Sequence, residues 1–180
     1  MAKIPTYIAL LRGINVGGHK KVPMAKLRAI LSEIGLKNVK TYIQSGNVVF
    51  TASEVNAQHF ETKIKEAIKA QFNFNVPVIV KSVEDFKIIF DNCPFSETIK
   101  PDTYFVLLSE IPENQLVLEA IQKTYPDEEF HIINDCIYLY CPNGYGKAKF
   151  NLKYFERKLN VSATTRNYKT MVKLLSLSDI

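Results

Sequence analysis

Cysteine, histidine and long apolar runs are all scarce in this chain, and each shortage excludes a class of protein. The three cysteines are an odd number without CxxC spacing, which argues against both a disulfide framework and a zinc site. None of the three histidines lies at metal-ligand spacing from another histidine or a cysteine. No apolar run approaches the roughly 20 residues that span a bilayer. The sequence therefore predicts no metal, no cofactor and no membrane partner.

Familiar catalytic and phosphate-binding motifs are absent as well. The glycines within residues 13–18 have the wrong spacing for G-x-G-x-x-G, and Ser45 has no G-x-S-x-G context. Cys141 stands where a P-loop would begin with glycine, and Ala148 replaces the serine or threonine that would hold magnesium. An enzyme needs an acid, base, nucleophile or metal in a placed geometry. The sequence assigns no catalytic residue and leaves open whether the protein is an enzyme.

What is present is the composition of an ordinary folded protein with a mild excess of positive charge. Of 180 residues, 47% are apolar and 23% are charged, which suits one compact domain or two small subdomains that share a core. The net charge is +5 and the isoelectric point is about 9.0, a bias toward anionic partners. Residues 1–5 show no long apolar stretch and no cleavage pattern, so the sequence predicts a cytoplasmic location.

Hydrophobic periodicity predicts one order of elements twice, strand-helix-strand-strand-helix-strand-helix. In the first copy we expect strands at 7–11, 40–44, 48–51 and 76–80 and helices over 24–34, 60–72 and 83–90. In the second copy we expect strands at 103–108, 129–133, 136–141 and 162–165 and helices over 112–121, 152–159 and 168–175. Residues 92–102 hold two prolines and no periodicity, and we interpret them as a linker between an N-terminal half, 1–91, and a C-terminal half, 103–180.

The two copies differ in one connection. Pro23 and Pro112 open the corresponding helices, and each stands twenty-three positions before a hairpin turn, at Gly46 and Asp135 respectively. Between the first strand and Pro23 lie about ten residues, whereas the second copy has only a few. Connections of about 2–6 residues are usual, and longer ones are often functional. The longer loop, Arg12–Lys21, is therefore the predicted site.

The chemistry of this loop favours an anion. The loop lies between the end of a strand and the start of a helix, where backbone N–H groups are free. Arginine offers a planar fork for phosphate or carboxylate, and lysine offers a mobile point charge. With the neighbouring hairpin turn, the predicted ligand-binding residues are Arg12, Asn15, Gly17, Gly18, Lys20, Lys21, Gln44, Ser45 and Asn47. The alternative is a turn-rich loop whose asparagines and glycines only satisfy backbone geometry.

Three further predicted ligand contacts lie in the second half. Lys147 belongs to a glycine-lysine segment. Arg166 and Asn167 stand at the start of the last helix, again where N–H groups are free. Basic residues spaced by four form stripes on the last two helices, which are either solvated faces or a track for a phosphate backbone.

Tyrosines in the second half have two interpretations. Tyr138 and Tyr140 alternate on one face of a predicted strand, and Tyr104 lies on the neighbouring strand. Such residues stack on bases in some RNA-binding sheets, but the RNP1 pattern that accompanies them is absent here. Cross-strand packing is the other interpretation.

Three stretches resemble the bacterial DUF1697 family, whose members are uncharacterised. They are residues 8–18 (IALLRGINVGG), 22–24 (VPM) and 42–50 (YIQSGNVVF). Residues 164–168 (TTRNY) are similar to the closing motif of the family, which usually has Trp at the position of Tyr168. The resemblance implies an α+β fold of two ferredoxin-like halves, with antiparallel sheets and helices packed on them. It implies no activity.

The leading hypothesis from the sequence is a cytoplasmic protein that binds an anionic, phosphate-bearing ligand, with nucleic acid among the ligands considered. Arg12 and Lys20 would make the main charge contacts, while Asn15, Ser45 and Asn47 would orient the ligand. Two alternatives stay open: an enzyme acting on a small phosphorylated or carboxylated metabolite, and a structural or oligomerising module. The sequence predicts no oligomeric state.

Overall fold

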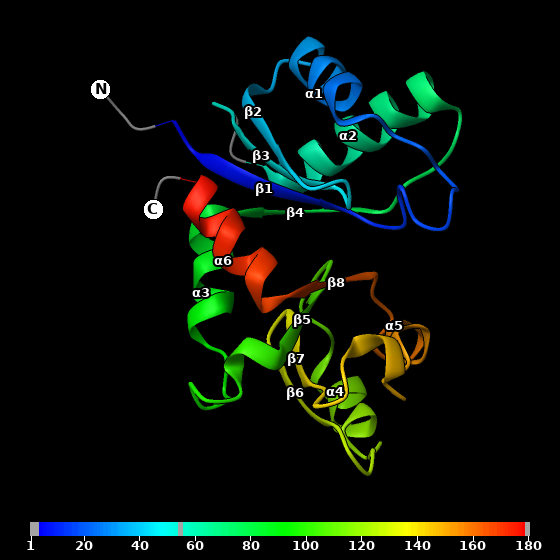
Figure 1. The fold of residues 1–180 in the computed structure, drawn as a ribbon, viewed down its shortest axis with the longest axis vertical. Coiled ribbons are helices and arrows are strands. Elements are labelled where there is room, and N and C mark those ends of the chain that lie inside the picture. The colour runs from blue at the N-terminus through cyan, green and yellow to red at the C-terminus, as the bar shows by residue number, and fades with distance from the viewer. Residues whose placement is uncertain (1–3, 54–55, 179–180) are drawn as a thin grey trace. The chain divides into compact units, whose positions relative to one another are not determined.

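Each half of the chain builds its own four-stranded antiparallel sheet (Figure 1). The structure, a computed structural model, describes residues 4–53 and 56–178. These residues form two units: the first contains 4–53, 56–88 and 173–178, and the second contains 89–172. The division falls inside two helices, α3 (Val83–Asp91) and α6 (Tyr168–Leu177), so each of these helices belongs to both units.

The first unit has the predicted order of elements. They are β1 (Thr6–Leu11), α1 (Met24–Glu33), β2 (Lys37–Tyr42), β3 (Asn47–Thr51), α2 (Ala57–Phe72) and β4 (Val78–Ser82). The strands lie in the order β2-β3-β1-β4, and α1 and α2 cover one face of the sheet (Figure 1). Leu27, Ile30 and Leu31, whose helical spacing predicts α1, are the side chains that this helix buries.

The second unit repeats this arrangement. Its elements are β5 (Thr103–Leu108), α4 (Asn114–Ala120), β6 (Glu129–Ile133), β7 (Cys136–Tyr140), α5 (Leu152–Leu159) and β8 (Ala163–Asn167), with short 3-10 turns at Lys100–Asp102 and Tyr145–Lys147. Its strands lie in the order β6-β7-β5-β8, which matches the first sheet position by position. Two β-α-β-β-α-β units of this kind confirm the predicted fold class, a duplicated ferredoxin-like α+β protein.

Backbone hydrogen bonds show which residues of the two units correspond. The Leu11 N–H donates to the Gly46 carbonyl at 2.8 Å, and the Leu108 N–H donates to the Asp135 carbonyl at 2.9 Å. The turns at Gly46 and Asp135 are therefore equivalent, as their spacing from the two prolines predicts. Leu11 is eight residues further from its turn than Leu108 is, and all of this extra length lies before Pro23. The loop between β1 and α1 is thus longer than its counterpart.

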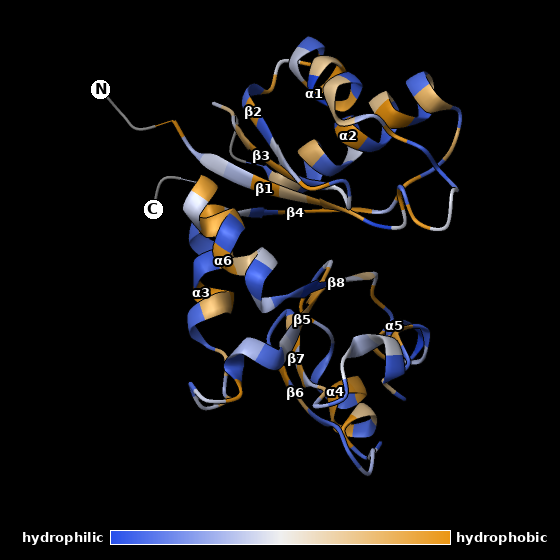
Figure 2. Ribbon diagram, in the orientation of Figure 1, coloured by the Kyte–Doolittle hydropathy of each residue, from blue (hydrophilic) through white to orange (hydrophobic). Residues whose placement is uncertain are grey.

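Aromatic rings fill much of both cores. In the first unit the rings of Tyr7, Phe50 and Phe60 lie 4.9 to 5.6 Å apart between centroids. In the second unit Phe150 stacks on Phe155 with centroids 4.6 Å apart. Such pairs stabilise a fold by about 0.5–1.5 kcal/mol beyond the area that they bury. Figure 2 shows hydrophobic and hydrophilic residues alternating along α2, as a helix with one buried face requires.

The three tyrosines of the second sheet do not share one face. Tyr138 pairs with Phe105 across the sheet, whereas Tyr104 pairs with Leu139 and therefore points to the opposite face. Tyr138 is only 1% exposed, and its hydroxyl donates to the Ile89 carbonyl at 2.7 Å. A buried, hydrogen-bonded tyrosine offers no ring for a base, so cross-strand packing on Phe105 is the correct interpretation for Tyr138.

Candidate functional site

The loop that connects β1 and α1, residues 12–23, is folded onto itself. We call it the β1–α1 loop. The Asn15 N–H donates to the Lys20 carbonyl at 3.1 Å, and the His19 N–H donates to the Val16 carbonyl at 3.1 Å. These bonds close a tight turn, and Gly17 supplies one of its left-handed backbone conformations with a φ of 58°. The loop therefore has backbone hydrogen bonds of its own.

Asn15 fastens this loop to its surroundings. Its backbone has a φ of 55°, and its side-chain amide donates to the Val22 carbonyl at 2.9 Å and to the Gln44 carbonyl at 2.8 Å. The amide oxygen accepts a hydrogen bond from the Val22 N–H at 2.8 Å. The Gln44 contact joins the loop to the hairpin turn that follows β2, which confirms that these two stretches are neighbours in space.

An open depression of about 550 Å³ lies where the loop meets the start of α1. It is lined by Asn15, Gly18, Lys21, Val22, Pro23, Met24, Ala25 and Gln44. Four of the predicted ligand-binding residues meet here: Asn15, Gly18, Lys21 and Gln44. Lys21 is exposed and is the only cation in this wall among the residues that the structure describes.

The first turn of α1 faces the depression without a cap. Pro23 occupies the N-cap position in an extended conformation, and it offers no side-chain hydrogen bond to the helix. The first turn has no acidic residue. Within the described ranges, the N–H groups of Met24, Ala25 and Lys26 have no hydrogen-bond partner. These amides give the depression a partial positive charge that adds to the charge of Lys21.

The other predicted residues of this region lie around the depression and not in its wall. The Lys20 ammonium donates to the Asn75 carbonyl at 2.7 Å and lies 5.9 Å above the Phe74 ring, so it holds the loop against the segment before β4. Arg12 is partly buried, and its backbone N–H donates to the Pro77 carbonyl at 3.0 Å. Gly17 is exposed at the tip of the loop.

Ser45 and Asn47 stabilise the hairpin turn. The Asn47 side chain is fully buried and donates to the Ser45 hydroxyl at 2.9 Å and to the Tyr42 carbonyl at 3.2 Å. This geometry places Asn47 behind the turn, where it holds the backbone that carries Gln44. Its effect on the depression is therefore indirect.

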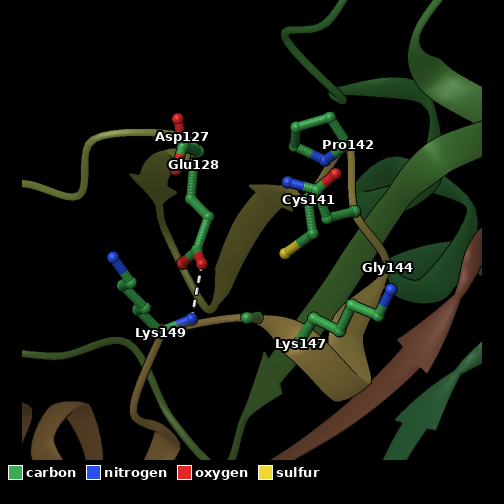
Figure 3. A pocket seen from close by; sticks show the side chains of 9 residues that line it. Asp127, Glu128, Cys141, Pro142, Gly144, Lys147 and Lys149 are labelled. Atoms are coloured by element: carbon green, nitrogen blue, oxygen red, sulfur yellow. Dashed lines mark hydrogen bonds between the residues drawn. The ribbon is translucent and has the colours of Figure 1, made fainter.

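The remaining predicted contacts belong to the second unit. Lys147 borders a small hollow of about 40 Å³, which also includes Glu128 (Figure 3). In Figure 3 the Glu128 carboxylate points to the backbone of Lys149, whose N–H it accepts, and it also accepts the Phe150 N–H at 2.8 Å. Glu128 therefore holds the segment before α5 in place through two backbone N–H groups. The hollow has room for little more than water.

Arg166 and Asn167 support the start of α6. Arg166 is almost completely buried, and its guanidinium donates to the Thr164 hydroxyl at 2.9 Å and to the Thr165 carbonyl at 2.8 Å. Burial lowers the pKa of Arg166 to about 10, so it stays protonated at neutral pH. Asn167 accepts the Thr170 N–H at 2.9 Å, which is the bond of an N-cap residue. Both side chains have structural partners.

Sequence reasoning missed the part of the wall formed by Val22, Met24 and Ala25. A usable signal was nevertheless present, because Pro23 opens a helix where serine, threonine, aspartate or asparagine would normally cap it. A helix start without such a residue leaves its N–H groups available to something else.

In residues 4–53 and 56–178, no group of three histidine, cysteine, aspartate or glutamate side chains is placed to hold a metal ion. No helix within those ranges has the length and apolar character needed to cross a bilayer.

Comparison with known proteins identifies the family of this chain. A model of a family described as protein of unknown function, DUF1697, matches residues 4–138. The chain belongs to the DUF1697 family. The matched range contains the β1–α1 loop and the hairpin turn, and it ends before the resemblance at residues 164–168. No curated protein matches the chain.

A solved structure is similar to this DUF1697 protein along nearly its whole length. The chain is similar to a conserved bacterial protein, SP0830 from Streptococcus pneumoniae, with a TM-score of 0.76 and 29% sequence identity. The match covers 98% of this chain and 99% of the other. The fold of both units therefore recurs in that bacterial protein.

Proposed function

We propose that this DUF1697 protein binds an anionic, phosphate-bearing ligand in the depression beside the β1–α1 loop. The observation that supports the proposal is that Lys21 and the uncapped first turn of α1 line the same open depression. A phosphate there would accept hydrogen bonds from the Ala25 and Lys26 N–H groups and pair with the Lys21 ammonium. Lys21 takes the role that the sequence suggested for Arg12 and Lys20.

The charge of the first unit supports this proposal. Its described residues include thirteen lysines and arginines but only five aspartates and glutamates. The second unit has nine basic residues and eleven acidic ones. The positive charge of the chain is therefore concentrated on the unit that contains the depression. This charge would attract an anion from solution toward that unit.

The fixed position of the wall also supports binding. Asn15 holds the loop to Val22 and to Gln44 at once, so Lys21 and the Gln44 side chain start from neighbouring, ordered backbone. A preformed site binds without the cost of ordering its parts. His19 and Ser45 are outside the wall as the described residues define it, and so nothing here favours catalysis.

A titration with pyrophosphate tests the proposal. We expect backbone NMR signals of Gly18, Ala25 and Lys26 to shift as pyrophosphate is added to the wild-type protein. Lys21→Ala should raise the dissociation constant for pyrophosphate about threefold to tenfold, because one phosphate contact is lost. Lys69→Ala, which removes an exposed lysine from α2 of the same unit, is the control and should leave the titration unchanged. Absence of shifts at α1, or equal effects of the two substitutions, would overturn the proposal.

A further inference from the structure

A second cation lies one helical turn along α1 from the depression. Arg28 follows Met24 by four residues and Ala25 by three, so it shares their side of the helix. Its Nη1 atom donates to the Thr41 hydroxyl on β2 at 2.7 Å, and the side chain is partly buried. This single bond to a neutral hydroxyl fixes the direction of the guanidinium. No carboxylate among the described residues pairs with Arg28, so its remaining donors are available.

The surface around these residues is almost free of negative charge. Between residues 4 and 53 the chain has seven basic side chains and a single acidic one, Glu33 at the end of α1. Next to Arg28 on the helix surface stand Ala25, Ala29 and Ser32, which are small and exposed. A chain of phosphates could therefore approach the helix closely along this side, since neither bulk nor negative charge opposes it.

The shape of the depression distinguishes between classes of anion. Sites for small ligands usually enclose most of the ligand surface in an apolar pocket with a few polar groups. This depression is open, and its one cation, Lys21, is followed by a second cation, Arg28, outside the depression. An open surface with one cation in the depression and another beyond it suits a polymer, whose neighbouring charges are contacted in succession.

We propose that the anion is the phosphate backbone of a nucleic acid, held by Lys21 in the depression and by Arg28 one turn further along α1. This inference rests on the proposed function, because it names the class of ligand for the same site. A guanidinium, an ammonium and backbone amides on one exposed side of a helix would contact phosphates, which carry no sequence information. Binding is therefore independent of sequence and steeply dependent on salt.

Fluorescence anisotropy with a fluorescein-labelled DNA duplex of mixed sequence tests this inference. We expect Lys21→Ala and Arg28→Gln each to weaken binding about threefold to tenfold and to reduce the slope of log K against log salt concentration by about 0.9. Arg28→Lys keeps the charge, so it should retain the wild-type slope. Lys69→Ala is the matched control and should bind as the wild type does. Far-UV circular dichroism and a thermal melt establish that each variant is folded; should Arg28→Gln fail to fold, Lys21→Ala and Arg28→Lys decide the question.

The outcomes separate this inference from the proposed function. If pyrophosphate shifts the signals of Ala25 and Lys26 while the duplex does not bind, the site is one for small anions and the inference fails alone. If neither binds, both fail. The inference is also overturned if Lys69→Ala weakens duplex binding as much as Arg28→Gln does, or if polyglutamate displaces the duplex as readily as unlabelled DNA.

Discussion

A Cβ atom at Gly46 would lie 2.6 Å from the Cβ atom of Leu11. It would also lie 2.9 Å from the Leu11 carbonyl oxygen, and the Gly46 backbone has a φ of 83°. Glycine alone combines this conformation with so close an approach. The contact holds the hairpin turn against the end of β1, and it thereby fixes Gln44 beside the β1–α1 loop.

Substitution of Gly46 tests that relationship. We expect Gly46→Ala to lower the free energy of unfolding by more than about 2 kcal/mol, because both the left-handed conformation and the collision with Leu11 oppose a side chain. Gly35→Ala is the control: its φ is 95°, but an added Cβ meets nothing within 4 Å, so we expect a loss of about 1 kcal/mol. Urea denaturation followed by circular dichroism measures both losses. Equal losses would show that the close approach to Leu11 is unimportant.

Asn15 allows a similar test of the β1–α1 loop. Asn15→Ala removes the two hydrogen bonds exchanged with Val22 and the one donated to Gln44, and we expect a loss of about 2–3 kcal/mol together with faster amide exchange at Val22. Asn73→Ala is the control, since Asn73 has a φ of 58° but no side-chain hydrogen bond in the described part of the chain. Its loss should be near 1 kcal/mol. Similar values for both variants would mean that backbone strain, and not the three bonds, explains Asn15.

Glu61 makes stability depend on pH. Its carboxylate accepts the Val80 N–H at 2.9 Å on β4, and burial raises the pKa of Glu61 above its ordinary value. The folded protein then binds this proton more tightly than the unfolded chain does. The free energy of unfolding must therefore fall as pH rises from the ordinary glutamate pKa through the raised one.

Glu61→Gln removes that titration while keeping an oxygen for Val80. We expect the free energy of unfolding of the variant, relative to wild type, to increase across this pH window and to level off above it. Chemical denaturation at a series of pH values measures the difference. Glu66→Gln, on an exposed position of α2, controls for the introduction of glutamine on this helix. A difference for Glu61→Gln that does not change with pH would contradict the interpretation.

The cysteines should be unreactive in the folded protein. Cys93, Cys136 and Cys141 are all buried, and burial raises the pKa of the Cys141 thiol to about 11. A raised thiol pKa leaves little thiolate near neutral pH, and thiolate is the form that attacks disulfide reagents. We expect Ellman's reagent to label none of them rapidly at pH 8 and all three in guanidinium chloride. Rapid labelling of any thiol without denaturant would be evidence against this burial.

The fold was predictable because its signals repeat. Apolar periodicity predicts every helix and strand in order, with ends that differ by a few residues. The equal spacing from the two prolines to their turns locates the longer loop. β4 begins at Val78 instead of Val76, because Pro77 has no N–H to donate to the ladder.

The candidate site was less accessible to sequence reasoning. Asn47 appears polar and available in the sequence, yet it is buried behind the turn, because hydrogen bonds to Ser45 and Tyr42 satisfy it there. Arg28 is one of three charged residues on an amphipathic helix, and only the position of Thr41 on β2 shows where its guanidinium points. The sequence suggests that Glu128 is only a surface residue. In the fold its carboxylate accepts the N–H of Lys149, which lies 21 residues later in the chain. These properties depend on tertiary contacts, which local patterns do not encode.

The division of the chain inside α6 has a consequence for biosynthesis. Residues 173–178 belong to the first unit, and the Lys40 ammonium donates to the Leu177 carbonyl at 3.2 Å. On the ribosome, residues 4–88 emerge first, but these last residues are translated only after the whole second unit. The N-terminal unit therefore begins to fold early and is completed last, when the end of α6 reaches it.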